Sequence, residues 1–153
     1  MTRDELRVFL SPLPDEAIFG LTLYGEARGE PIEGLIAVAC VIRNRLLDSK
    51  KRWGADYRAV CLQPHQFSTW SEAGGKANYE ELIRATTILL SNEIAPPLLE
   101  QAAWCALGVS RGAIIDNVKK SNHYHVSTMN PRPKWAQPYA PKLQVGHHVF
   151  YVL

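Results

Sequence analysis

The chain has 153 residues, of which 46% are hydrophobic and 21% are charged, and its formal net charge at pH 7 is +2. This size and composition are typical of one globular domain, expected over residues 1–153 with a core that starts near residue 15. So small a net charge gives no reason to expect a nucleic-acid-binding protein.

No apolar stretch approaches the length of a transmembrane helix, and the N-terminal residues contain no apolar segment typical of a secretory signal. We therefore expect synthesis in the cytoplasm and no stable insertion into a membrane. The three cysteines are an odd number without a C-x-x-C pair, which argues against a disulfide framework or a zinc–cysteine site. Cys40 and Cys105 lie within apolar helical patterns and are expected in the core.

The first half of the chain reads as helices. Residues 1–13 are expected to form a polar lead-in or a short helix. A helix then begins near Pro14, where Asp15 can act as its N-cap, and it carries Glu26 at its C-terminal end. Residues 32–42 are apolar on nearly all faces, which predicts a buried central helix.

Asn44 and Arg45 are polar residues at the point where this central helix leaves the core, and we expect them to form structural hydrogen bonds rather than to take part directly in chemistry. The helical patterns continue at residues 56–62, 78–94 and 98–109.

The last part of the chain has a different texture. Residues 122–126, 131–135 and 146–152 are short β-prone pieces among prolines, and the first and last can pair as an antiparallel ribbon. The chain is therefore expected to be mainly α (α+β), with a small C-terminal β-ribbon.

The stretch Tyr24–Pro31, YGEARGEP, holds two carboxylates, an arginine and two glycines within eight residues. A carboxylate that ends one helix beside a very apolar second helix can be partly desolvated, and desolvation raises its pKa. A carboxyl group with a raised pKa can serve as a general acid near neutral pH, so Glu26 is the candidate acid. The alternative is that Glu26 and Glu30 are solvated charges at helix ends, since most carboxylates in proteins are.

A second candidate segment is Gln63–Trp70, which is rich in amide and aromatic side chains. Amides hydrogen-bond hydroxyl groups and aromatic faces stack on sugar rings, although the two aromatic residues can equally belong to the core. Glycosidase chemistry fits these features, because cleavage of a glycosidic bond requires a proton donor. A second carboxylate is available at Glu30, Glu33, Asp48 or Asp56, but no position singles one out.

The motifs together resemble the cell-wall hydrolase family of the spore cortex-lytic enzymes and related phage and proteobacterial proteins. The resemblance begins at Tyr24–Pro31 and continues through Glu33-Gly34 and Val41–Arg45. Further motifs follow in the family's order at Gln66–Ser68, Asn122–His125, Trp135 and Gly146–Tyr151.

This resemblance implies a peptidoglycan-cleaving enzyme: a single catalytic domain with a lysozyme-like, lytic-transglycosylase-like fold and with Glu26 as catalytic acid. It implies cleavage between N-acetylmuramic acid and N-acetylglucosamine, as a lytic transglycosylase or, alternatively, as a lysozyme-type muramidase with the same Glu26. No cofactor or metal ion is expected. The residues expected to bind the glycan strands are Tyr24, Arg28, Gln66, Phe67, Tyr124, His125 and Trp135.

Two other classes of protein stay open. One is a zinc-dependent peptidoglycan amidase, in which His123 and His125 share one face of a strand and join His147 or His148 and a carboxylate. The other is a non-catalytic glycan-binding phage protein. The substrate lies outside the membrane, so release is needed, for example as a phage endolysin through a holin. We expect the protein to act on the cell wall as a monomer.

Overall fold

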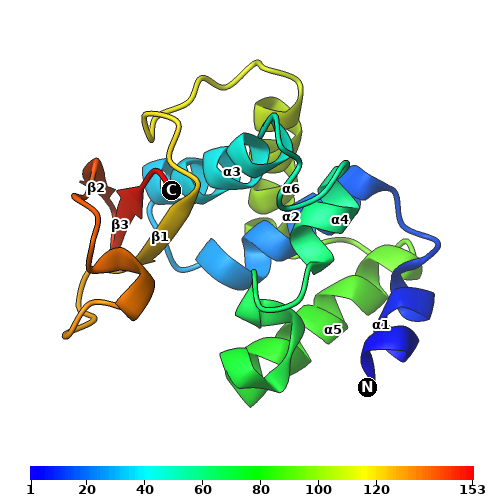
Figure 1. The fold of residues 1–153 in the computed structure, drawn as a ribbon. Helices are drawn as coiled ribbons and strands as arrows, with labels where there is room; N and C mark the ends of the chain where they lie inside the picture. The colour runs from blue at the N-terminus through cyan, green and yellow to red at the C-terminus, as the bar shows by residue number, and fades with distance from the viewer.

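Six α-helices and a three-stranded sheet make up the computed structural model, which describes all residues 1–153. The helices form a body from which the sheet projects on one side as a smaller lobe (Figure 1). The helices are α1 (Arg3–Leu10), α2 (Asp15–Ala27), α3 (Ile32–Leu46), α4 (Tyr57–Leu62), α5 (Lys76–Leu90) and α6 (Pro97–Ser110). None of them has the length and apolar character needed to cross a membrane.

The core forms where α2 and α3 pack against α6. Residues 37–42 of α3 are all fully buried, which confirms the expected central helix. In α2, Gly20 allows a close approach to α6, since a Cβ at this position would lie 3.3 Å from the Cα of Ala103. Both helices therefore run through the interior, and their ends reach the surface where the body meets the sheet.

The sheet has strands β1 (His123–Val126), β2 (Leu143–Val145) and β3 (His148–Tyr151) in the order β1-β3-β2. β1 pairs antiparallel with β3, with His125 opposite Val149, so the expected ribbon is confirmed. The sequence did not reveal β2, which also pairs with β3. The expectation for residues 131–135 was wrong, because Lys134–Ala136 form a 3-10 helix.

Several local expectations are corrected in detail. The fifth helix is α5 at Lys76–Leu90, shifted towards the N-terminus from the expected 78–94. Asp15 is not the N-cap of α2: the cap position is Pro14 without a side-chain hydrogen bond, and Asp15 instead pairs with Arg58 at 3.2 Å. The cysteines are all buried and free.

Glu30, in the loop between α2 and α3, ties the sheet to the helical body. Its Oε2 accepts a hydrogen bond from the backbone N–H of His147 at 3.0 Å. Its Oε1 lies 3.2 Å from Nδ1 of His147 and 3.4 Å from Nδ1 of His148. A Cβ at Gly34 would lie 2.7 Å from Glu30 Oε2, so glycine leaves the space for this carboxylate. The turn between β2 and β3 is thereby fixed to the start of α3.

We expect Glu30→Ala to lower the free energy of unfolding by about 1–3 kcal/mol, because it removes hydrogen bonds to a charged and largely buried acceptor. Chemical denaturation would measure this, with Glu93→Ala as the control, since Glu93 is exposed in the loop before α6. Equal stability of the two variants would show that Glu30 does not hold the sheet.

Candidate active site

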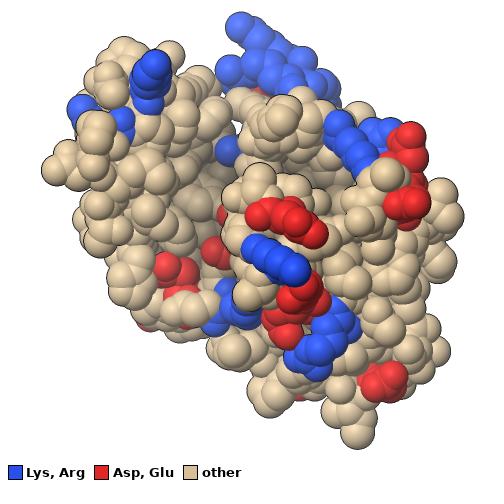
Figure 2. All heavy atoms as spheres, turned by 90° about the horizontal axis from the view of Figure 1, so that it is seen from below, with Lys and Arg blue, Asp and Glu red and all other residues tan.

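Glu26 is the last residue but one of α2, and its carboxylate accepts hydrogen bonds from both the helical body and the sheet. Oε1 accepts a hydrogen bond from the backbone N–H of Thr69 at 3.1 Å, in the 3-10 helix η1 (Ser68–Trp70) of the helical body. Oε2 accepts one from the hydroxyl of Tyr124 at 2.9 Å, on β1 of the sheet. Figure 2 shows the surface hollowed between a smaller lobe and the body, with acidic atoms on the floor of the hollow.

Gly25 allows η1 to come this close to α2. A Cβ on Gly25 would lie 2.8 Å from Cβ of Thr69, so any larger residue would push η1 away. Asn78 of α5 closes the arrangement, since its Nδ2 donates to the carbonyl of Gly25 at 3.1 Å and to Oγ1 of Thr69 at 3.2 Å. The N–H group that binds Glu26 is thus held in place by two elements.

Burial raises the pKa of Glu26 above its usual value, because removal from water disfavours the charged form. The hydrogen bonds from Thr69 and Tyr124 and the charge of Arg45 act in the opposite direction and only partly offset this effect. A carboxyl group in this environment can hold a proton at a higher pH than an exposed glutamate. It can also be stabilised as a carboxylate after the proton has left.

Arg45, near the end of α3, is a buried cation beside this carboxylate. It is only 4% exposed, and its Nε donates to the carbonyl of Asn122 at 2.7 Å. Its guanidinium lies over the ring of Phe67, 4.9 Å from the centroid, and 5.9 Å from that of Trp53. Its Nη1 is buried without a hydrogen-bond partner. The expected structural hydrogen bond is present, whereas the electrostatic effect of Arg45 on Glu26 could not be predicted from the sequence.

Tyr124 is held as a hydrogen-bond donor. Burial, followed by the charge of Glu26, raises the pKa of its phenol well above the usual value, so the hydroxyl keeps its proton. The ring packs edge-on against His148, with centroids 4.9 Å apart. The position of Tyr124 therefore depends on the pairing of β1 with β3.

Three of the four other candidate carboxylates are engaged in contacts elsewhere. Glu30 holds the turn before β3, as described above. Asp48 forms an ion pair with Arg52 at 3.1 Å. Asp56 caps α4 by accepting from the N–H of Ala59. Glu33 is exposed in the first turn of α3.

Tyr24 and Arg28 are both expected to bind glycan. Tyr24 lies on α2 before Glu26, and Arg28 is the C-cap residue that follows this helix. Tyr24 is 4% exposed, and its hydroxyl donates to Glu81 of α5 at 2.6 Å. Arg28 lies over the Tyr24 ring at 5.0 Å and donates to Oδ1 of Asn78. In this structure both residues join α2 to α5.

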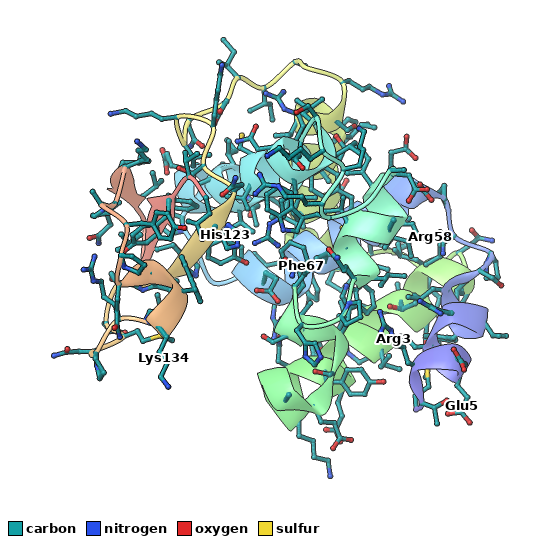
Figure 3. The ribbon with its side chains drawn as sticks, viewed as in Figure 1. Arg3, Glu5, Arg58, Phe67, His123 and Lys134 are labelled. Carbon is teal, nitrogen blue, oxygen red and sulfur yellow. The ribbon has the colours of Figure 1, made fainter.

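The remaining residues expected to bind glycan differ in exposure. Gln66 and Trp135 are half-buried, whereas Phe67 and His125 are only 5% and 7% exposed. The ring of His125 packs against Trp135, 5.9 Å between centroids. Figure 3 shows Phe67 near the middle of the molecule and Lys134 pointing outwards from the lobe. Gln66 and Trp135 offer the larger surface to a ligand.

His123 and His125, the two strand histidines considered as zinc ligands, have other hydrogen-bond partners. In His125, Nδ1 lies 2.8 Å from the carbonyl of Val126 and Nε2 lies 3.0 Å from the hydroxyl of Tyr151. Nδ1 of His123 lies 2.9 Å from Oδ1 of Asn122, and burial lowers the pKa of His123 to about 4. No group of three or more His, Cys, Asp or Glu side chains is placed to hold a metal ion.

Comparison with known proteins gives a family and a fold. The family model described as cell wall hydrolase matches residues 29–151, a range that begins three residues after Glu26. The catalytic domain of the Bacillus cereus SleB protein superposes with a TM-score of 0.61 and 23% identity, over 89% of this chain and 88% of that one.

A second solved structure is the catalytic domain of the germination-specific lytic transglycosylase SleB from Bacillus anthracis. It has the same TM-score and identity and covers 89% of this chain and 92% of that one. These likenesses confirm the expected lysozyme-like fold, mainly helical with a small C-terminal sheet. A search of curated protein sequences found no significant match.

We expect Gly25→Ala to lower the melting temperature, because the added Cβ would clash with Thr69. We also expect it to lower the activity on purified cell walls about tenfold or more, because it displaces the donor to Glu26. Gly29→Ala is the matched control, since a Cβ at Gly29 meets nothing within 4 Å. Thermal melting and release of soluble wall fragments would be measured for both. Full activity of Gly25→Ala would contradict the role given to the contact with Thr69.

Proposed function

This chain belongs to the cell wall hydrolase family, and we propose that it cleaves peptidoglycan between N-acetylmuramic acid and N-acetylglucosamine as a lytic transglycosylase. Glu26 is the general acid and then the general base. The observation that carries the proposal is the largely buried Glu26 carboxylate, held between the Thr69 N–H and the Tyr124 hydroxyl where the two lobes meet. The lytic transglycosylase named for the Bacillus anthracis structure supports this reaction type.

In the first step, protonated Glu26 donates its proton to the oxygen that links C1 of muramic acid to the next sugar. The bond from C1 to this oxygen breaks, and positive charge develops on the muramic ring as an oxocarbenium-like transition state. The raised pKa of Glu26 keeps the proton available for this transfer.

In the second step, the Glu26 carboxylate takes the proton from the C6 hydroxyl of the same muramic acid. The C6 oxygen then forms a bond to C1, which leaves a 1,6-anhydro end and returns Glu26 to its protonated state. No water molecule is consumed and no second carboxylate is required. The placement of Glu30, Asp48 and Asp56 in other contacts supports this route.

Arg45 stabilises the intermediate stage of this cycle. When Glu26 has given up its proton, its negative charge is buried, and the nearby guanidinium charge offsets the cost. Thr69 and Tyr124 donate their hydrogen bonds to the same carboxylate. Arg45 is therefore a positioning and electrostatic residue that acts through Glu26.

A lysozyme-type muramidase with the same Glu26 is the second candidate, and its products distinguish it. Release from the cytoplasm as an endolysin through a holin, and action as a monomer, stay predictions.

We expect Glu26→Gln to abolish turnover while the melting temperature stays within a few degrees of wild type, because glutamine keeps the size of the side chain but cannot donate the proton. Glu16→Gln, at an exposed position on the same helix, is the matched control and should keep full activity. Mass spectrometry of fragments released from purified peptidoglycan would detect 1,6-anhydromuramic ends from the wild type.

Reducing muramic ends from the wild type would keep Glu26 as the acid but make the enzyme a muramidase. Free stem peptides, or retained turnover in Glu26→Gln, would overturn the proposal.

The pH dependence gives a second test. Activity should fall as the pH rises through the pKa of Glu26, because the acid must be protonated. Arg45 lowers this pKa, so Arg45→Gln should raise it further, which moves the basic limb of kcat/KM to higher pH. The maximal rate should fall by about tenfold or more, because the buried carboxylate loses its cation.

Arg45→Lys keeps the charge and should leave the limb closer to its wild-type position. Arg43→Gln, which changes a neighbouring cation of α3 that donates to Val109, should leave the limb unmoved. An unchanged limb in Arg45→Gln would show that Arg45 serves packing alone.

A further inference from the structure

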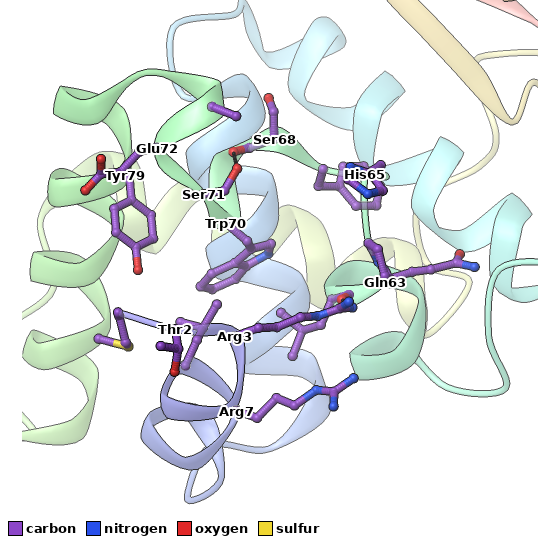
Figure 4. A pocket seen from close by; sticks show the side chains of 16 residues that line it. Thr2, Arg3, Arg7, Gln63, His65, Ser68, Trp70, Ser71, Glu72 and Tyr79 are labelled. Atoms are coloured by element: carbon purple, nitrogen blue, oxygen red, sulfur yellow. Dashed lines mark hydrogen bonds between the residues drawn. The ribbon is translucent and has the colours of Figure 1, made fainter.

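A pocket of about 630 Å³ lies on the helical body and does not include Glu26 (Figure 4). Its walls come from α1, from the segment between α4 and η1, from η1 itself and from the start of α5. The α1 wall lies outside residues 29–151, the range matched by the family model. This pocket is thus partly built from a segment that the family comparison does not describe.

Two arginines of α1 place positive charge in this pocket. Nη2 of Arg3 donates to the carbonyl of Leu62 at 2.8 Å, which fixes the side chain and leaves most of its five N–H groups available. Arg7 pairs only with the exposed Asp4, at 3.7 Å, a contact of little strength in water. In Figure 4 both side chains extend towards the side of the pocket where Gln63 lies.

The opposite part of the pocket is aromatic. Trp70 and Tyr79 are each 8% exposed and line the wall together with Leu6. Nε1 of Trp70 donates to Oγ1 of Thr22 at 2.9 Å, so the indole is fixed in orientation. The pocket therefore offers guanidinium groups on one side and a rigid apolar surface on the other.

The pocket and the catalytic carboxylate share η1. Ser68 and Trp70 line the pocket, while Thr69 between them donates its N–H to Glu26. Thr22, which holds Trp70, lies four residues before Glu26 on α2, about 6 Å along the axis. η1 and α2 therefore connect the pocket to the residue that is proposed to act on the glycan strand.

Positive charge continues beyond the pocket. A neighbouring hollow of about 820 Å³ shares Arg3 and Arg7 with it and adds Lys51. Arg52 and Arg58 also line this hollow, but each has an acidic partner. The only acidic residues that line either space are Glu72 and Asp56. The surface around the pocket therefore attracts anions.

We propose that this pocket binds the peptide stems of peptidoglycan, with Arg3 and Arg7 taking free stem carboxylates and the Trp70–Tyr79 wall taking the aliphatic parts of the stem. Planar guanidinium groups match carboxylates in geometry. The apolar wall favours a peptide with methyl and methylene groups over a polyol phosphate. The inference rests on the proposed function, because stems are attached to the muramic acid that Glu26 would act on.

The test compares peptide-bearing glycan strands with the same strands after an amidase has removed the stems. Wild type should have a lower KM for peptide-bearing strands, and the double variant Arg3→Gln, Arg7→Gln should lose about fivefold to tenfold of this preference, as expected for lost charged hydrogen bonds. The matched control is Arg111→Gln, Lys119→Gln, which removes the same charge from exposed positions that line neither space.

The single variants Arg7→Gln and Arg7→Glu are included because Arg3 also anchors α1, and melting temperatures check the fold of each variant. Arg7→Glu should reduce the preference further than Arg7→Gln. Equal KM values of wild type for the two kinds of strand, or an unchanged preference in both Arg7 variants, would overturn the proposal.

Binding is measured separately from catalysis, by calorimetry with the free tetrapeptide stem on the Glu26→Gln protein. Binding that Arg7→Glu abolishes supports the pocket even if glycan cleavage fails, so failure of the proposed function is distinguishable. Polyglycerol phosphate is the competing probe. Binding of this polymer at the pocket without binding of the stem would overturn the assignment to peptide.

Discussion

Burial of the Glu26 carboxylate at the end of α2 costs free energy, and the rest of the site is arranged so that this cost is offset. This cost is offset by a backbone N–H from η1, a phenol from β1 and a cation from α3, that is, by groups from three separate elements. Each of these groups must be held against the others, and hydrogen bonds from Asn78 and to the carbonyl of Asn122 do so. The site is thus stable only when the helical body and the sheet are joined correctly.

The charge of Arg45 is effective because of what surrounds it. Its guanidinium packs against the rings of Trp53 and Phe67 and donates a hydrogen bond to the backbone carbonyl of Asn122. It forms no ion pair with a carboxylate. A buried ion pair would cancel most of its field at Glu26, whereas aromatic faces and a carbonyl leave the net charge in place. A cation held in this way acts on the Glu26 carboxylate without neutralising it.

The sequence predicted those parts of the molecule that rest on local patterns. The apolar run of α3 and the motif that carries Glu26 could be identified because helical periodicity and glycine spacing are local properties. Thr69 and Asn78 could not, because Thr69 meets Glu26 across 43 residues and contributes a backbone group that its side chain does not announce. β2 has only three residues, too few for an alternating pattern, and is formed by its pairing with β3. The sequence could thus single out Glu26 as a candidate acid, but the environment of its carboxylate is set by tertiary contacts.

Glu26 and Glu30 stand four residues apart, and they serve opposite sides of the site. Glu26 is the proposed proton donor, and Glu30 holds the turn that precedes β3, the strand with which β1 and its Tyr124 pair. The length of this short loop therefore sets the width of the hollow beside Glu26. An insertion or deletion between these two residues would change both that width and the direction in which the Glu26 carboxylate points. The spacing of the motif is for this reason a geometrical quantity as much as a chemical one.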